Sequence, residues 1–169
     1  MRILSVSTAT NHLSVALNDS QQIIVEKNEQ DERNHSEHLD PLIDEILKEN
    51  QLTLKDIDRF AVAIGPGSYT GLRIGITTVK MFASVLNKEV VGISTLQALA
   101  KSVKEDALVI TGLDARNNNY FAAGYKSGDI PDNVIPDGHY NIDVLIKAIQ
   151  DYTAKNEVKK LVLVGTGLE

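Results

Sequence analysis

The sequence predicts an α/β protein in which one structural unit occurs twice. Short runs rich in β-branched residues alternate along the chain with longer segments of helical periodicity. The order strands, helix, strand appears first between residues 2 and 64 and begins again near residue 107, without recognisable sequence identity. With 169 residues, 43% of them hydrophobic, the chain can bury a core as one domain or as two small ones. We place two domains, at residues 1–103 and 104–169.

Three short strands open the first unit, and the turn residues between them predict an antiparallel meander. The strands are expected at residues 2–8, 13–17 and 22–27. The polar residues 28–38 that follow predict a loop.

A helix comes next, because apolar residues recur at helical spacing. Its apolar face consists of Leu39, Leu42, Ile43, Ile46 and Leu47. Either the helix begins at Pro41 with Asp40 as its cap, or it begins near Ser36 and bends at Pro41. A short capped turn at Thr53–Asp56 then leads into a strand at residues 60–64.

The stretch Gly65–Gly75 joins this strand to a long apolar helix that ends near Leu86. Glycines on both sides of Pro66 let the backbone turn with positive φ. The spacing matches neither the Walker A pattern, which needs a lysine after its last glycine, nor the dinucleotide pattern G-x-G-x-x-G. Such a turn can hold a phosphate or another protein, although structural punctuation is the more common meaning of isolated glycines beside a proline.

The long helix presents two different faces. The apolar stripe consists of Leu72, Ile76, Val79, Ala83 and Leu86. The second face, with Gly71, Gly75 and Thr78, has almost no side-chain bulk. A helix that is apolar or small on nearly every side is normally buried. The glycine face therefore needs a cover, which is either another part of this chain or a second subunit.

The second half of the chain repeats the pattern in a shorter form. Strands are expected at residues 88–93, 107–113, 119–126 and 161–165, and helices at residues 95–102 and 142–152. Residues 128–138, rich in glycine, proline and aspartate, interrupt the pattern. No helix follows the last strand to cover it, so we expect the second domain to be short or truncated.

Composition limits the possible partners. The absence of cysteine excludes disulfides and thiolate metal sites and fits a reducing cytosol. The net charge of −6 and the lack of a basic run longer than Lys159–Lys160 predict weak binding to nucleic acid. No stretch resembles a signal peptide or approaches the roughly 20 apolar residues of a membrane span. We expect a cytoplasmic protein with no membrane contact.

Candidates for chemistry are few. His35 and His38 could share a helix face, but no third ligand completes a zinc set. Ser68 does not lie in a nucleophile elbow, so a capping role is the simpler interpretation. Asp114 and Arg116 at a strand end form either a reactive pair or, more commonly, a turn cap or ion pair.

Five stretches, taken together and in this order, resemble the TsaB (YeaZ) family: residues 1–10, 35–39, 65–75, 92–96 and 114–116. The glycine block is highly specific, and the resemblance runs from end to end of the chain. It implies the actin-like ATPase (ASKHA) fold of two ribonuclease-H-like domains, in agreement with the repeat. The family serves in the threonylcarbamoyl modification at N6 of adenosine 37 in tRNAs that read ANN codons.

The resemblance also implies an accessory role without catalysis. The chain would bind the larger paralogue TsaD, which carries a metal and transfers the threonylcarbamoyl group, with TsaE as an ATPase in the same assembly. ATP or ADP and the metal are then expected in the partner complex and not in this chain, and tRNA would be contacted only through the complex. Alone, the chain is expected to form a homodimer.

Two departures from related sequences agree with a role without catalysis. His35 and His38 are too close in sequence to form the H-x-x-x-H pair of the catalytic paralogue. Ser7-Thr8-Ala9 stands where the family usually has D-T-S, so the aspartate that actin-like ATPases use near phosphate and magnesium is absent.

The family's interface lies on the two helices described above, so the resemblance implies a partner interface there and no catalytic, cofactor-binding or metal-binding residue in this chain. The expected interface residues are Leu39, Leu42, Ile43, Ile46, Tyr69, Gly71, Leu72, Arg73, Gly75, Thr78 and Phe82. Tyr69 and Arg73 are also types that interfaces favour. On this interpretation Gly75→Arg should weaken association and leave the monomer folded. The alternative is an enzyme, either an actin-like ATPase or a glycoprotease-like metallohydrolase that would bind metal through His35 and His38.

Overall fold

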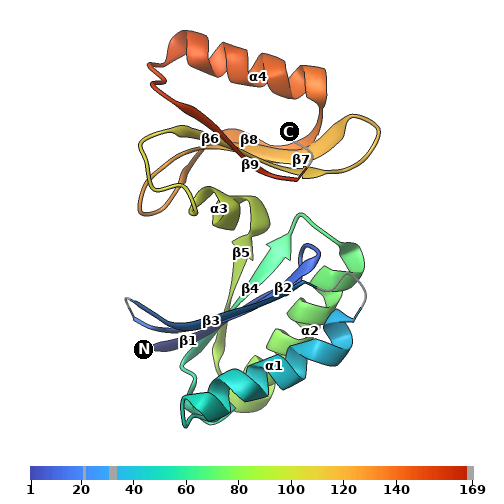
Figure 1. Ribbon diagram of the computed structural model, residues 1–169, viewed down its shortest axis with the longest axis vertical. Helices are drawn as coiled ribbons and strands as arrows, with labels where there is room; N and C mark the ends of the chain where they lie inside the picture. The colour runs from blue at the N-terminus through green and yellow to red at the C-terminus, as the bar shows by residue number, and fades with distance from the viewer. Residues whose placement is uncertain (21, 31–33, 167–169) are drawn as a thin grey trace. The chain divides into compact units, whose positions relative to one another are not determined.

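The structure, a computed structural model, describes residues 1–20, 22–30 and 34–166, and the chain divides into two compact units (Figure 1). Unit 1 is Met1–Ile93 and unit 2 is Ser94–Glu169. This boundary lies earlier than the expected division at residues 103 and 104. The reason is that helix α3 (Thr95–Ala100) belongs to unit 2, where Leu96 and Ala100 are buried in one cluster with Val109.

A five-stranded sheet carries unit 1, in the order β3-β2-β1-β4-β5. Its strands are β1 (Arg2–Ser7), β2 (His12–Asp19), β3 (Gln22–Gln30), β4 (Arg59–Gly65) and β5 (Glu89–Ser94). Strands β1, β2 and β3 are antiparallel neighbours, which confirms the predicted meander. Strand β4 returns parallel to β1.

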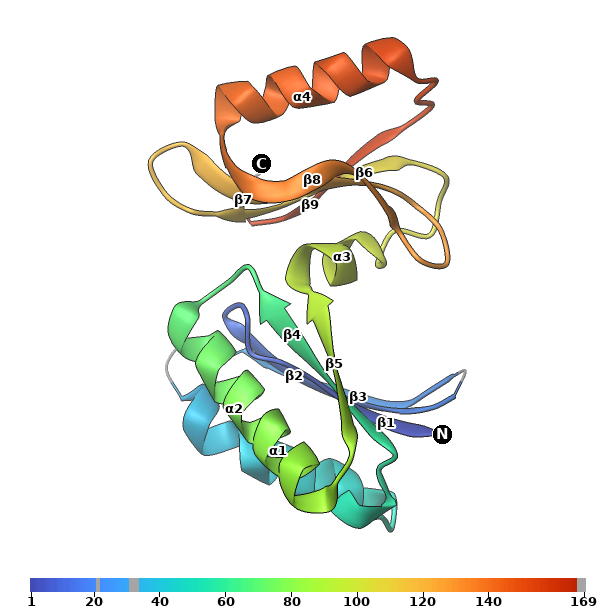
Figure 2. The same cartoon turned by 180° about the vertical axis from the view of Figure 1, so that it is seen from behind.

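Two helices, α1 (His35–Glu49) and α2 (Tyr69–Leu86), cover one face of this sheet (Figure 2). Helix α1 begins at His35 with Pro41 inside it, so the earlier of the two predicted starts is correct. Of the predicted loop at 28–38, residues 28–30 extend β3 and 35–38 form the first turn of α1, while residues 31–33 lie outside the described residues.

The capped turn before β4 is confirmed as a 3₁₀ helix, η1 (Leu54–Asp56). The carboxylate of Asp56 accepts hydrogen bonds from the backbone N–H and the hydroxyl of Thr53, both at 2.8 Å. These two bonds satisfy groups that the start of a helix otherwise leaves without partners.

Unit 2 is built on a four-stranded sheet in the order β8-β7-β6-β9. Its strands are β6 (Leu108–Asp114), β7 (Asn119–Lys126), β8 (Asp132–Asn141) and β9 (Leu161–Gly165). Strand β8 falls largely within residues 128–138, where no strand was expected. Its one proline, Pro136, is compatible with a strand because β8 lies at the edge of the sheet, where a missing N–H interrupts no central ladder.

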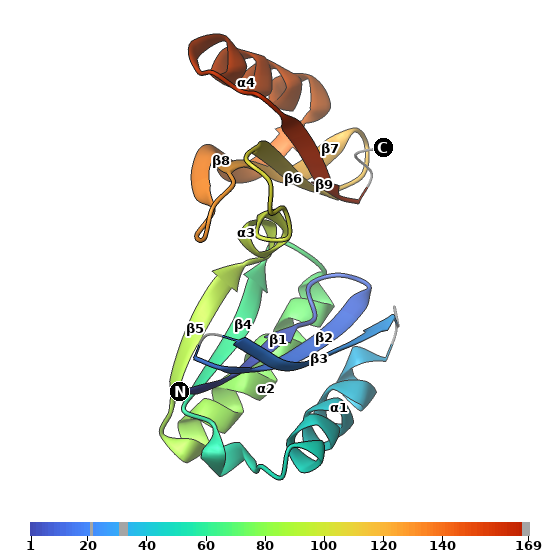
Figure 3. The ribbon, with the colours of Figure 1, turned by 60° about the vertical axis from the view of Figure 1, so that its left-hand side comes forward.

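Helix α3 and helix α4 (Ile142–Lys155) lie on opposite faces of this sheet (Figure 3). Strands β6, β7 and β8 are antiparallel neighbours, and β9 is parallel to β6. This arrangement reproduces β1 to β4 of unit 1 strand by strand, so the predicted duplication of an α/β unit is confirmed.

A buried tyrosine of β7 is hydrogen-bonded to an aspartate of β8 in unit 2. Tyr125 is 2% exposed, and its hydroxyl donates a hydrogen bond of 2.7 Å to Asp137 Oδ1. The hydroxyl of Ser94, just before α3, donates to the other oxygen of the same carboxylate at 2.8 Å. Burial first, and the bond to Asp137 second, raise the pKa of Tyr125 from 10.0 to about 12.

We expect this tyrosine to make the stability of the fold depend on pH in alkaline solution. The folded chain favours the neutral phenol, so the contribution of Tyr125 is fully present below pH 10 and is lost as the pH rises from about 10 to about 12. Urea unfolding followed across this interval should show a steeper decline for the wild type than for Tyr125→Phe. Equal slopes for the two proteins would contradict the assignment.

Candidate partner-binding surface

The glycine block does not form an open surface; it packs on the end of β1. The N–H of Ser68 donates to the carbonyl of Ala9 at 2.7 Å, and the Thr8 hydroxyl donates to the carbonyl of Gly71 at 2.7 Å. A Cβ atom at Gly71 would lie 2.1 Å from the carbonyl oxygen of Thr8, and one at Gly75 would lie 2.4 Å from Oγ1 of Thr8. These glycines are needed because the α2 backbone and β1 must approach this closely.

This packing shows that more than half of the expected interface residues were assigned wrongly. Six of its eleven residues are buried within unit 1 and cannot contact a partner while the unit is folded: Leu39, Leu42, Ile43, Ile46, Gly71 and Gly75. The buried stripe of α2 is Gly71, Gly75, Val79 and Ala83. The small-residue face therefore meets the chain's own sheet, and no second subunit is needed to cover it.

The remaining expected residues lie nearer to solvent. Leu72, Thr78 and Phe82 are partly buried, whereas Tyr69 and Arg73 are exposed at the start of α2. Tyr69 is 75% exposed, and the Arg73 guanidinium carbon lies 5.5 Å from the centre of its ring. Ser68 caps the helix, because its hydroxyl oxygen accepts a bond of 3.2 Å from the N–H of Gly71.

An apolar groove of about 480 Å³ lies along the last two turns of α2, between this helix and η1. It is lined by Thr53, Leu54, Lys55, Met81, Phe82, Val85 and Leu86. Met81 is 51% exposed and Val85 79%. We call Met81, Phe82, Val85 and Leu54 the α2 groove.

Sequence reasoning missed Met81 and Val85. The available signal was their spacing, because two apolar residues one turn apart lie outside the buried stripe of an otherwise packed helix. The ring of Phe82 fixes the base of the groove, since its centre lies 6.1 Å from that of the buried Phe60.

The outer face of α1, in contrast, is charged. Lys48 pairs with Asp44 at 2.5 Å, and Lys27 of β3 reaches Glu45 and Glu49, both at 2.7 Å. The hydrogen bonds to these two glutamates raise the pKa of Lys27 above its ordinary value of 10.5. The apolar area of the helical layer is therefore concentrated on α2.

The two histidines do not act together. Nε2 of His35, which is buried, lies 3.0 Å from the carbonyl oxygen of Thr10, and it carries the proton because a carbonyl can only accept. His38 instead lies 3.2 Å from a carboxylate oxygen of Glu29. Within the described residues, no group of three histidine or acidic side chains is placed to hold a metal ion.

Asp114 serves as a turn cap, as the simpler interpretation predicted. Its Oδ1 accepts a hydrogen bond of 2.7 Å from the backbone N–H of Arg116. Residues Arg116, Asn117 and Asn118 all have positive φ, and the cap supports this tight connection between β6 and β7.

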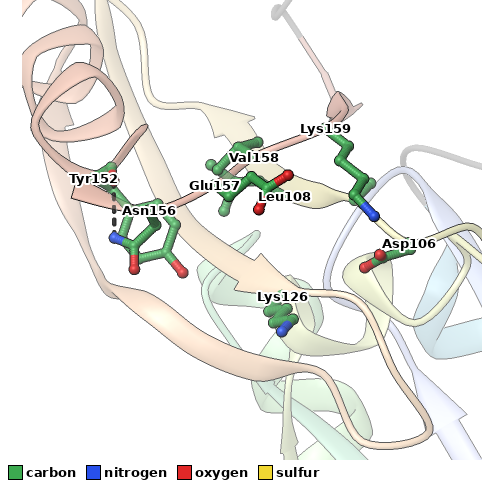
Figure 4. A pocket seen from close by; sticks show the side chains of 9 residues that line it. Asp106, Leu108, Lys126, Tyr152, Asn156, Glu157, Val158 and Lys159 are labelled. Carbon is green, nitrogen blue, oxygen red and sulfur yellow. Dashed lines mark hydrogen bonds between the residues drawn. The ribbon is translucent and has the colours of Figure 1, made fainter. Parts of the chain in front are cut away.

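A second hollow, of about 390 Å³, lies in unit 2 between β6, β7 and the segment after α4 (Figure 4). The ammonium groups of Lys126 and Lys159 and the carboxylates of Asp106 and Glu157 line it. All four side chains belong to exposed residues and carry charges of both signs, so the hollow favours neither an anion nor a cation.

Comparison with known proteins identifies the family. Residues 22–167 match the family model described as TsaD: tRNA N6-adenosine threonylcarbamoyltransferase. The tRNA threonylcarbamoyladenosine biosynthesis protein TsaB of Escherichia coli is 34% identical over 99% of this chain and 72% of its own length. The chain belongs to the TsaB (YeaZ) family. TsaB of Bacillus subtilis is 33% identical over 81% of this chain and 61% of its own length, so the chain spans about three fifths of that relative.

Solved structures agree with this membership. YeaZ from Pseudomonas aeruginosa superposes with a TM-score of 0.75 at 26% identity, covering 83% of this chain and 66% of that one. The likeness to YeaZ and the duplicated topology confirm the predicted actin-like fold with two ribonuclease-H-like units. Within the described residues of this TsaB-family chain, no helix combines the length and apolar character that crossing a membrane requires.

Proposed function

We propose that this chain acts in tRNA threonylcarbamoyladenosine biosynthesis as a non-catalytic subunit that binds TsaD in the cytoplasm. The observation that carries the proposal is the α2 groove, an apolar surface on a helix whose other side is already packed. The names of the TsaB relatives supply the pathway. The match to the TsaD family model points to the same pathway, and TsaD as the partner is our proposal.

The α2 groove suits a protein partner better than a small polar substrate. Five of its seven lining residues are apolar, the other two being Thr53 and Lys55, and the lining contains no carboxylate or histidine that could act in acid–base catalysis. Exposed methionine and aromatic side chains around such a groove are typical of interface cores. Tyr69 and Arg73 are also exposed, at the other end of α2 and outside the groove.

Two features support a role without catalysis. Each histidine described above is engaged with a structural partner, Thr10 or Glu29. The turn after β1 holds Thr8 and Ala9, whose side chains provide no carboxylate for magnesium. In this proposal ATP or ADP and the metal belong to TsaD and TsaE, and tRNA is contacted only through the complex, as the net charge of −6 favours.

The test is the association of this chain with TsaD from the same organism, followed by light scattering and titration calorimetry. We expect a one-to-one complex. The pair of substitutions Met81→Glu and Val85→Glu should weaken it by at least about 100-fold, because both carboxylates would be buried without partners. Both residues are exposed in the free chain, so the variant should keep its fold.

Ile130→Glu is the matched control, since Ile130 is 80% exposed and lies in unit 2. An unchanged affinity for the Met81 and Val85 variant would remove the α2 groove from the interface, and the absence of any complex with wild type would overturn the accessory role. The same light-scattering runs on the chain alone test the proposed homodimer, which should give way to the heterodimer as TsaD is added.

A further inference from the structure

A small pocket of about 270 Å³ lies in unit 1 at the first turn of α2, at the opposite end of this helix from the α2 groove. Three segments that are distant in sequence form it: the connection between β1 and β2, the first residue of α1, and the start of α2. The volume suits a small ligand, because pockets for larger organic ligands begin at about 300 Å³. The lining residues are Thr10, Asn11, His35, Ser68, Thr70, Gly71 and Ile74.

The histidine in the wall of this pocket has a buried nitrogen without a partner. His35 is 7% exposed, and its Nδ1 has no hydrogen-bond partner within the described part of the chain. The ring proton is on Nε2, which donates to the carbonyl oxygen of Thr10 at 3.0 Å. Nδ1 is therefore a hydrogen-bond acceptor, and a buried acceptor that stays without a donor is costly. A ligand that carries a donor would satisfy it.

The start of α2 supplies hydrogen-bond donors to the same pocket. N–H groups in the first turn of a helix have no partner within the helix, and the helix dipole makes this end electropositive. The N–H of Gly71 is taken by the hydroxyl oxygen of Ser68. The N–H of Thr70, in the same turn, and the hydroxyl protons of Thr70 and Ser68 can still bind a ligand. None of the described lining residues is acidic, so no carboxylate among them repels an anion.

We propose that this pocket binds a small oxyanion that carries a proton, of which hydrogen phosphate is the simplest example. Its oxygens accept from the start of α2, and its O–H donates to Nδ1 of His35. Sulfate has the same charge as hydrogen phosphate but no O–H, so it leaves Nδ1 without a donor. A phosphate monoester also has no O–H in mildly alkaline solution, because its second pKa is about 6. The buried acceptor thus selects the protonated ion, and this selection does not depend on the binding of TsaD.

The test is titration calorimetry of the complete chain with inorganic phosphate, sulfate and methyl phosphate, in mildly alkaline buffer of constant ionic strength. We expect saturable one-to-one binding of phosphate, and binding of the other two ions that is weaker by at least about tenfold. His35→Phe should weaken phosphate binding by at least about tenfold and leave sulfate binding nearly unchanged, which removes the preference. His38→Phe is the matched control, because His38 does not line the pocket, and it should bind phosphate as the wild type does.

A second variant and a spectroscopic signal keep the test independent of the folding of His35→Phe. Thr70 is exposed, so Thr70→Val should remain folded and weaken phosphate binding by at least about threefold. In long-range ¹H–¹⁵N spectra, phosphate should shift the resonance of the unprotonated Nδ1 of His35, and sulfate should not. The proposal is overturned by an absence of saturable phosphate binding, by equal affinities for phosphate and sulfate, or by an Nδ1 resonance that stays in place when phosphate is bound.

Discussion

Gly75→Arg is expected to unfold unit 1, with a loss of more than about 3 kcal/mol in its free energy of unfolding. A Cβ at this position would lie 2.4 Å from the hydroxyl oxygen of Thr8, which is buried and bonded to the carbonyl of Gly71. The arginine would add both bulk and a charge where the helix meets β1. This corrects the expectation that the variant would keep its fold and lose only its partner.

The measurement is hydrogen exchange at the amides of β1 and α2, which reports on unit 1 directly. Thr77→Arg is the matched control, because Thr77 is on the exposed side of the same helix and receives the same side chain. Gly71→Ala tests the same close approach of α2 to β1 with a smaller side chain. In a helix, alanine is normally more stable than glycine by up to about 1 kcal/mol. Here its Cβ would lie 2.1 Å from a backbone oxygen, so we expect destabilisation. A folded Gly75→Arg protein would show that α2 can move away from β1.

Phe60→Ala is expected to cost about 3–5 kcal/mol, the usual loss for a fully buried phenylalanine. Phe60 is 0% exposed. It lies beside β1 in the sheet and contacts the ring of Phe82 on α2. Leu161→Ala, at the equivalent register position of unit 2, should cost about 1 kcal/mol or less, because that side chain is already 46% exposed.

The comparison tests the structural equivalence of β4 and β9 and the partial exposure of Leu161. Urea unfolding followed by hydrogen exchange in each unit would give the two losses separately. A cost for Leu161→Ala close to that of Phe60→Ala would mean that the leucine is buried in solution.

Much of the fold could be predicted because its signals are local. The meander of β1 to β3 follows from β-branched runs separated by turn residues, and the capping box at Thr53–Asp56 is contained in four consecutive residues. Strand β8 was missed for the same reason. Its residues Pro136 and Gly138 indicate a turn locally, and only the place of β8 at the edge of the sheet makes a strand possible.

The candidate surface was predicted less well, because it depends on contacts between distant parts of the chain. The sequence shows that Gly71 and Gly75 lack side chains but does not show that they meet Thr8, more than sixty residues earlier. Because the glycine face packs on the sheet, the exposed side of α2 includes Tyr69, Arg73, Met81 and Val85. The helix itself was thus predicted correctly, whereas the glycine face that was expected at the interface is buried against the sheet.

The distribution of aromatic residues between the two units decides what a spectroscopic unfolding experiment can report. The chain has no tryptophan and five tyrosines, of which four lie in unit 2: Tyr120, Tyr125, Tyr140 and Tyr152. The fifth, Tyr69, is 75% exposed in the folded state, so its environment changes little on unfolding. Tyrosine fluorescence therefore follows the melting of unit 2 almost alone, and a midpoint measured in this way does not report on the unit that carries the α2 groove.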